Sequence, residues 1–155
     1  ISEATGLGKA SLYHHFPQGK EQMAREVLML VDQAVEEHFI APLKANGSPK
    51  QKLTNMAKVV EDFYDGGNKG CLIEGLTLGD ANQLFQELIG ASIEGWIQAI
   101  AEVGIEAGLS KRIARERAEN ILIAIQGALV VSRALANRAL FKRVIREIPS
   151  MLLGS

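Results

Sequence analysis

Apolar residues recur every three or four positions along almost the whole chain, which is the period of an amphipathic α-helix. No segment alternates convincingly between apolar and polar residues, as a half-buried β-strand would. Proline disrupts a helix interior, so Pro42 and Pro149 are each expected to end a helix. The pattern predicts an all-α protein with a short first helix, long helices over residues 18–40, 49–65, 82–107 and 111–135, and a last helix ending at Pro149.

Capping residues mark the predicted helix boundaries. Ser48 and Ser110 stand where a hydroxyl can accept a hydrogen bond from the first amides of the following helix, and Pro49 suits a first helical turn. Gly108 is expected to end the helix 82–107. Between the two central helices, the glycine-rich passage from Cys71 to Gly79 predicts one or two short, irregular turns of helix.

The helix predicted over residues 111–135 is apolar around most of its circumference. Such a helix must be buried on more than one side, and in a chain this small we expect one side to contact a second subunit. The last helix carries an apolar stripe that can join this contact, giving four helices about a two-fold axis. The predicted homodimer interface contains Ile121, Ile125, Ala128, Leu129, Ser132, Leu140 and Val144.

Charge is unevenly distributed, although the 155-residue chain has a formal net charge of only −1. Residues 32–106 hold twelve acidic and five basic residues, whereas residues 107–155 hold nine basic and three acidic residues. A basic tail can bind nucleic acid, but here the bases interleave with an apolar stripe and lack base-stacking aromatics, which favours a solvated helix face. Attraction between the acidic and basic parts is a further interpretation.

The single cysteine, Cys71, cannot form an internal disulfide, and the sequence opens without a signal peptide. Together these features predict a reducing, cytoplasmic location. The longest apolar stretch, residues 121–131, is too short to span a bilayer, so no membrane partner is expected. Cys71 itself is either a buried, inert thiol or a redox sensor.

The opening residues carry the signals of a turn, a short helix and the start of a second helix. In the short helix, Leu12 and Phe16 lie on one face, whereas Tyr13 and His14 lie on others. The outer face offers hydrogen-bonding groups without acidic residues, which suits phosphate oxygens and base edges of DNA. The residues alone leave a generic surface turn as the alternative.

Two other interpretations of the opening residues are not supported. A phosphate-binding loop at Gly8-Lys9 would need Ser or Thr where Ala10 stands, and no strand precedes it. A metal site at His14-His15 is not favoured, because adjacent helical side chains point about 100° apart and no cysteine or carboxylate lies at ligand spacing. We expect no metal and no cofactor.

The same residues resemble a known family. Thr5-Gly6-Leu7, followed by Leu12-Tyr13-His14-His15-Phe16 and by Lys20-Glu21 at the next helix, is similar to the helix-turn-helix of the tetracycline-repressor (TetR) family. Gly19 and the run Gly70-Cys71-Leu72-Ile73 resemble more narrowly its lincomycin-resistance-regulator subgroup. The specific resemblance covers roughly the first 30 residues and implies that the family's first helix and most of its second precede Ile1.

The resemblance implies a DNA-binding transcriptional regulator. Residues 1–40 would form a partial helix-turn-helix domain with its connecting helix, and residues 41–155 a ligand-binding and dimerisation domain. The implied function is a repressor that a small apolar ligand releases from a palindromic DNA operator, and the implied DNA contacts are Lys9, Ser11, Tyr13, His14 and Lys20, with Tyr13 and Lys20 on phosphates.

A small-molecule pocket is the second functional expectation. Aromatic residues are few, yet Phe63, Tyr64, Phe85 and Trp96 fall on the two helices that flank the irregular passage, where a pocket mouth can form. Spacing alone favours ordinary core packing, whereas the resemblance favours an inducer pocket. The predicted ligand-binding residues are Met56, Phe63, Tyr64, Cys71, Phe85, Ile93, Trp96 and Ile97.

An enzyme is the alternative from a different class. Glu74 and Asp80 lie near the predicted pocket mouth, but no nucleophile, base and orienting group recur at a diagnostic spacing. We therefore expect no catalysis. A helical ligand-binding or dimerisation module without DNA binding is the remaining alternative.

Overall fold

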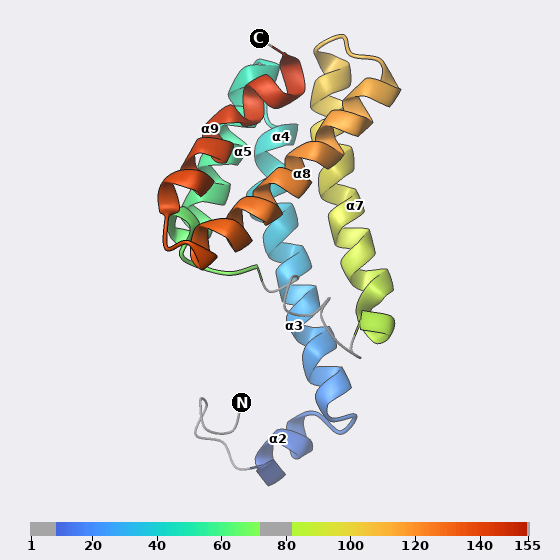
Figure 1. Ribbon diagram of the computed structural model, residues 1–155. Helices are drawn as coiled ribbons and strands as arrows, with labels where there is room; N and C mark the ends of the chain where they lie inside the picture. Colours follow the sequence, from blue (N-terminus) through green and yellow to red (C-terminus); the bar gives the residue numbers. More distant parts are fainter. Residues whose placement is uncertain (1–8, 72–81, 155) are drawn as a thin grey trace. The chain divides into compact units, whose positions relative to one another are not determined.

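The computed structural model describes residues 9–71 and 82–154, within which all regular structure is helical (Figure 1). The chain divides into two compact units, Ile1–Gln33 and Ala34–Ser155. The predicted domain boundary, between residues 40 and 41, differs from this division because Phe39 and Ile40 are buried in the larger unit. The predicted irregular passage and the turn at Gly6 and Gly8 fall outside the described residues.

The smaller unit contains the short helix α2, Lys9–His15, and the longer helix α3, Lys20–Ala34, most of which belongs to this unit. The turn between them closes when the Gly19 amide donates to the Phe16 carbonyl at 2.8 Å. Gly19 has a φ of +69°, a conformation that glycine adopts without steric cost. The predicted arrangement of a short helix, a turn and a long helix is confirmed here.

The chain does not leave the helical path at Pro42. A π-helix, η1, spans Val35–Ile40, and the short helix α4 follows over Ala41–Lys44. The Ala41 amide donates to the Glu36 carbonyl five residues earlier. In a regular α-helix the Pro42 ring would clash with the carbonyl four residues earlier, and the wider turn relieves this conflict. The prediction that Pro42 ends the helix was therefore wrong.

The helix α5, Pro49–Phe63, begins as predicted. Ser48 and Gln51 form a reciprocal capping box. The backbone amide of Ser48 donates to Gln51 Oε1 at 2.9 Å, and the backbone amide of Gln51 donates to Ser48 Oγ at 3.3 Å. The helix ends before the short turn η2, Asp65–Gly67, which contains two glycines.

The last three helices are α7, Asn82–Glu106, α8, Lys111–Ala134, and α9, Arg138–Leu153. Ser110 caps α8 by accepting from the Ile113 amide, as predicted. The prediction that Pro149 ends the last helix was wrong, because α9 continues past it to Leu153. Leu152 is completely buried, and this burial offsets the hydrogen bond that the proline cannot donate.

In the larger unit, α8 packs against α7 on one side and α9 on the other, and α5 packs against both α9 and η1 (Figure 1). Contacts between η1 and α7 complete a ring of helices around one core. The segment Phe85–Glu106 of α7 is long and apolar enough to cross a membrane by length and composition, but it packs in this ring as a core helix. The largest fully buried side chains are Phe39, Leu53, Met56, Val60, Ile100, Val103, Ile121, Ile125, Leu129, Phe141, Ile148 and Leu152.

Ion pairs link the acidic and basic parts of the chain, as one interpretation of the charge pattern suggested. Glu61 on α5 lies 3.6 Å from Lys142 on α9, and Glu94 on α7 pairs with Arg115 on α8. These side chains are partly exposed, so each ion pair contributes little to the free energy of unfolding. The pairs do link α5 to α9 and α7 to α8.

Candidate functional site

The α2 helix presents one apolar and one polar side within the smaller unit. Leu12 is buried, whereas Tyr13 is 52 % exposed and His14 is also exposed. Ser11 is half-buried, and Lys20 is exposed at the first position of α3. The predicted DNA-contact residues therefore expose hydrogen-bonding groups at Tyr13, His14 and Lys20, while the side chain of Lys9 lies outside the described part.

Gly19 positions the Tyr13 ring. A β-carbon placed on Gly19 would lie 3.2 Å from Tyr13 Cε1, so the ring lies directly against the glycine backbone. The nearby carboxylate of Glu21 pairs with Arg25 at 3.2 Å. Among the described residues no group of three or more His, Cys, Asp and Glu side chains could hold a metal ion.

An aromatic cluster forms inside the larger unit. Phe39 lies 4.8 Å from Trp96 and 5.1 Å from Phe63, measured between ring centroids, and Tyr64 lies 6.2 Å from both Phe39 and Phe141. Three of the residues predicted to bind a ligand, Phe63, Tyr64 and Trp96, lie around Phe39 in this cluster. The sequence prediction missed Phe39 and Phe141, because Phe39 was assigned to the connecting helix and Phe141 to the interface helix.

Tyr64 and Cys71 form a buried polar contact beside this cluster. The Tyr64 hydroxyl donates to Cys71 Sγ at 3.5 Å, and it also interacts with the side chain of Gln126. Burial, and secondarily the neighbouring thiol, raises the pKa of the Tyr64 hydroxyl well above its usual range. The hydroxyl therefore remains protonated and able to donate, and Cys71 is enclosed rather than exposed.

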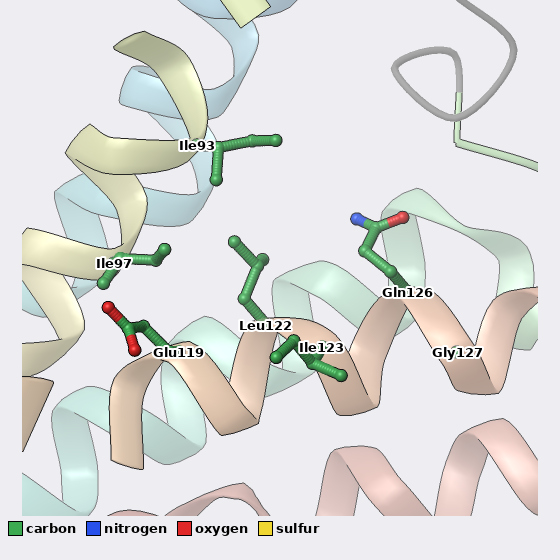
Figure 2. A pocket seen from close by; sticks show the side chains of 7 residues that line it. All are labelled: Ile93, Ile97, Glu119, Leu122, Ile123, Gln126 and Gly127. Carbon is green, nitrogen blue, oxygen red and sulfur yellow. The ribbon is translucent and has the colours of Figure 1, made fainter. Parts of the chain in front are cut away.

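Helices α7 and α8 line a groove of about 580 Å³ (Figure 2). Two of the predicted ligand-binding residues, Ile93 and Ile97, face it from α7. The other six do not line it: Met56, Tyr64, Cys71, Phe85 and Trp96 are buried, and Phe63 is 44 % exposed. The residues that line this groove are Ile93, Ile97, Glu119, Leu122, Ile123, Gln126 and Gly127.

The residues on the α8 side of the groove were not predicted from the sequence. The helix is apolar nearly all round, so composition alone does not separate its core face from its groove face. Glu119 and Gln126 carry the missing signal, because polar residues seven positions apart lie on the same face of an α-helix.

Arg115 fixes one end of the groove. Its guanidinium makes a bidentate contact with Glu94 on α7, and its Nε donates to Glu119 Oε1 at 2.6 Å. Hydrogen bonding from Arg115 lowers the pKa of Glu94, and the two carboxylates raise the pKa of Arg115. Glu94 and Arg115 are therefore both charged at neutral pH.

Two buried polar atoms on α7 have no hydrogen-bond partner in the described part of the chain. They are Ser92 Oγ and Trp96 Nε1, and the two residues lie one helical turn apart. Ser92 and Trp96 each come directly before a groove residue, Ile93 or Ile97. Their side chains are therefore on the adjacent face of α7.

Most of the predicted dimer-interface residues lie inside a single chain, which corrects that prediction. Five of the seven are buried within the bundle, because α8 uses this face to pack against α7 and α9: Ile121, Ile125, Ala128, Leu129 and Ser132. Leu140 and Val144 on α9 are half-buried and still reach the surface. The large apolar residues of α8 that are exposed are Ile123, Val130 and Val131, and Leu135, the residue directly after α8, is exposed as well.

Comparison with protein families identifies the larger unit. Residues 49–147 match the family model described as the C-terminal domain of LmrA/YxaF-like transcriptional regulators. The chain belongs to the LmrA/YxaF-like family of TetR regulators.

Individual relatives agree with this family. The LmrA/YxaF-like chain is 23 % identical to the HTH-type transcriptional regulator LmrA of Bacillus subtilis, and the alignment covers 98 % of this chain and 83 % of that protein. It is 22 % identical to the uncharacterised HTH-type transcriptional regulator YxaF of the same organism, with 98 % and 82 % covered. These relatives are transcriptional regulators rather than enzymes.

A solved structure supports the fold. A TetR transcriptional regulator from Legionella pneumophila superimposes with a TM-score of 0.82 at 20 % identity, over 98 % of this chain and 83 % of that chain. The LmrA/YxaF-like chain thus has the TetR fold.

Proposed function

We propose that this LmrA/YxaF-like regulator is a cytoplasmic repressor that binds a palindromic DNA operator and is released from it by a small apolar ligand. The observation that carries the proposal is the α2 helix, which exposes Tyr13 and His14 while burying Leu12. A short helix with this division of faces suits insertion into the major groove. Lys20 supplies a nearby cation for phosphate oxygens.

The proposed repressor acts as a homodimer. An apolar stripe formed by Ile123, Val130 and Val131 of α8 and by Leu135 at its C-terminal end is exposed in the single chain. Leu140 and Val144 on α9 are partly exposed. Apolar residues in this number favour burial against a second copy. A dimer can place two recognition helices on successive turns of DNA, about 34 Å apart.

The ligand acts by favouring one of two conformations. A molecule that binds more tightly to the conformation with mismatched recognition helices lowers the protein's affinity for the operator. By reciprocity, the operator lowers the protein's affinity for that molecule by the same factor. The groove between α7 and α8 is the proposed ligand site, since its volume lies within the range of small-molecule pockets.

The proposal is tested by a band-shift titration of the complete gene product on DNA flanking its own gene, with nonspecific competitor present. Selective binding is the expected result. Loss of selectivity, with the protein folded and dimeric, would favour the second candidate, a ligand-binding or dimerisation module without DNA binding.

A further inference from the structure

Two hydrogen-bonding groups on the core face of α7 are buried without a partner in the part of the chain that the structure describes. They are Ser92 Oγ and Trp96 Nε1, and the two residues are 8 % and 3 % exposed. A buried polar group without a partner destabilises a folded protein, so native structures contain few of them. Two of them one helical turn apart point to a shared partner that is not a side chain of the described helices.

The chemistry of the two groups specifies that partner. The indole N–H of Trp96 can only donate, and the Ser92 hydroxyl can donate as well, so a shared partner must offer an acceptor. The β-carbons of residues four positions apart on a helix are separated by about 5–6 Å, so one oxygen with two lone pairs can accept from both groups. No charged side chain is buried among the described residues, so none would neutralise an anion here. The acceptor is therefore the oxygen of a neutral group, such as a carbonyl.

A water molecule satisfies these two groups less well than a carbonyl oxygen does. Water that accepts from both groups keeps two hydrogens of its own, which need further acceptors. The neighbouring side chains are apolar: the centroid of the Phe39 ring lies 4.8 Å from that of Trp96, and Ile89 is buried three residues before Ser92. A carbonyl oxygen has no hydrogen, so it accepts from both donors and leaves no further polar group unpaired.

The aromatic cluster around Trp96 reaches the surface at Phe63. The Phe63 side chain is 44 % exposed, and its ring centroid lies 5.1 Å from that of Phe39 in an edge-on contact. Rotation of this exposed ring gives access to Phe39 without movement of a helix. Ser92 is also much shorter than Ile89 and Trp96 on the same face, so a ligand atom can approach its hydroxyl between them.

We propose that the core face of α7 is a second binding site, for a small neutral ligand whose carbonyl oxygen accepts hydrogen bonds from both Ser92 Oγ and Trp96 Nε1. The apolar body of the ligand contacts Phe39. The site lies on a different face of α7 from the groove that Ile93 and Ile97 line, so it goes beyond the proposed function.

Trp96 is the only tryptophan of the chain, so a single indole N–H resonance reports on this site. The test is an NMR titration of the isotope-labelled chain, without DNA, with cyclohexanone and with methylenecyclohexane. The two probes have the same shape, but one carries a carbonyl oxygen where the other carries a methylene group. Cyclohexanone should move the indole proton downfield, because a hydrogen bond deshields that proton, whereas methylenecyclohexane should not.

Substitution of Ser92 gives a second readout. Ser92→Ala should lower the affinity for cyclohexanone by about tenfold, because one hydrogen bond is lost, and should leave the affinity for methylenecyclohexane unchanged. The same substitution should raise the urea midpoint of the unliganded chain, because it removes a buried hydroxyl that has no partner.

Ser132→Ala is the matched control. Ser132 is also a buried serine in a helix, but its hydroxyl donates to the Leu129 carbonyl at 3.3 Å. This substitution should lower the urea midpoint and leave the affinities for both probes unchanged.

An indole resonance that responds to neither probe, or equally to both, would overturn the proposal. A lower urea midpoint for Ser92→Ala would also overturn it, because the hydroxyl would then already have a partner, such as an ordered water molecule. None of these outcomes depends on DNA, so failure here is distinguishable from failure of the proposed function, which the band-shift titration tests.

Discussion

Gly67 and Phe141 are in such close contact that a side chain at position 67 would collide with the aromatic residue. A β-carbon on Gly67 would lie 2.9 Å from Phe141 Cβ, and Gly67 also has a φ of +98°. The turn after α5 and the helix α9 can approach this closely only because position 67 has no side chain. Steric exclusion and backbone conformation thus act at the same residue.

Gly67→Ala is expected to destabilise the protein by about 1–3 kcal/mol, because alanine both strains the backbone and displaces Phe141. Gly90→Ala provides the opposite control. Gly90 lies within α7, and a β-carbon there meets nothing within 4 Å, so alanine should stabilise the helix by about 0.5–1 kcal/mol. Urea unfolding measures both values, and equal effects of the two variants would contradict the steric argument.

Phe141→Ala should destabilise the fold by about 3–5 kcal/mol, because it leaves a cavity beside Tyr64 where a completely buried ring was. Leu88→Ala is the comparison, since Leu88 is 37 % exposed and its truncation opens no closed cavity. The free energy of unfolding in urea distinguishes them. A small loss for Phe141→Ala would mean that the surrounding helices collapse into the space.

Glu94→Gln should lower stability at neutral pH and have no effect at low pH. Arg115 lowers the pKa of Glu94, so the ion pair stabilises the folded state above the carboxyl's ordinary pKa of 4.5. That contribution is lost as the pH falls through the lower folded-state pKa. Urea unfolding from pH 7 to pH 3 measures it, with Glu87→Gln as the control. If the free energy of unfolding of Glu94→Gln differed from that of the wild type by the same amount at every pH, the difference would not come from the ionised Glu94 carboxylate.

Val131→Glu and Leu135→Glu should convert the proposed dimer into folded monomers, because each places a charge in the exposed apolar stripe of α8. Light scattering gives the mass and circular dichroism the fold. Ile105→Glu is the control, since Ile105 is an exposed apolar residue on α7. Dimers that survive both α8 substitutions would place the interface elsewhere.

Lys20→Ala in the complete protein should weaken DNA binding for all sequences alike, and the slope of log affinity against log salt should fall by about one unit. Lys50→Ala removes an exposed lysine from α5 and should leave both quantities unchanged. Filter binding over a range of salt concentrations gives the slope. An unchanged slope for Lys20→Ala would remove this lysine from the phosphate contacts.

The sequence predicted helix boundaries well where a cap was local. Ser48 and Ser110 mark the starts of α5 and α8 because their hydroxyls act on the next three residues. Pro42 and Pro149 were misjudged. A π-helix before Pro42 relieves the clash of its ring, and the burial of Leu152 after Pro149 offsets the hydrogen bond that this proline cannot donate. These compensations depend on neighbouring helices, which periodicity does not reveal.

The candidate site was harder to predict than the fold. Phe63, Tyr64 and Trp96, which were predicted to bind a ligand, lie around Phe39 and do not line the groove. The groove residues on α8 were not found, and the core face of α8 was taken for a dimer face. A helix that is apolar all round has no internal marker of which side meets its own chain.

Each hydrogen-bonded turn of the π-helix Val35–Ile40 contains one more residue than a turn of α-helix. This segment can therefore lose one residue without changing which way its neighbours face. Deleting a single residue between Val35 and Phe39 would let the segment close as a regular α-helix, in which four residues rotate the chain about as far as five do in the wider turn. Phe39 would still face Trp96, so the centre of the aromatic cluster tolerates a one-residue deletion at this point of the chain.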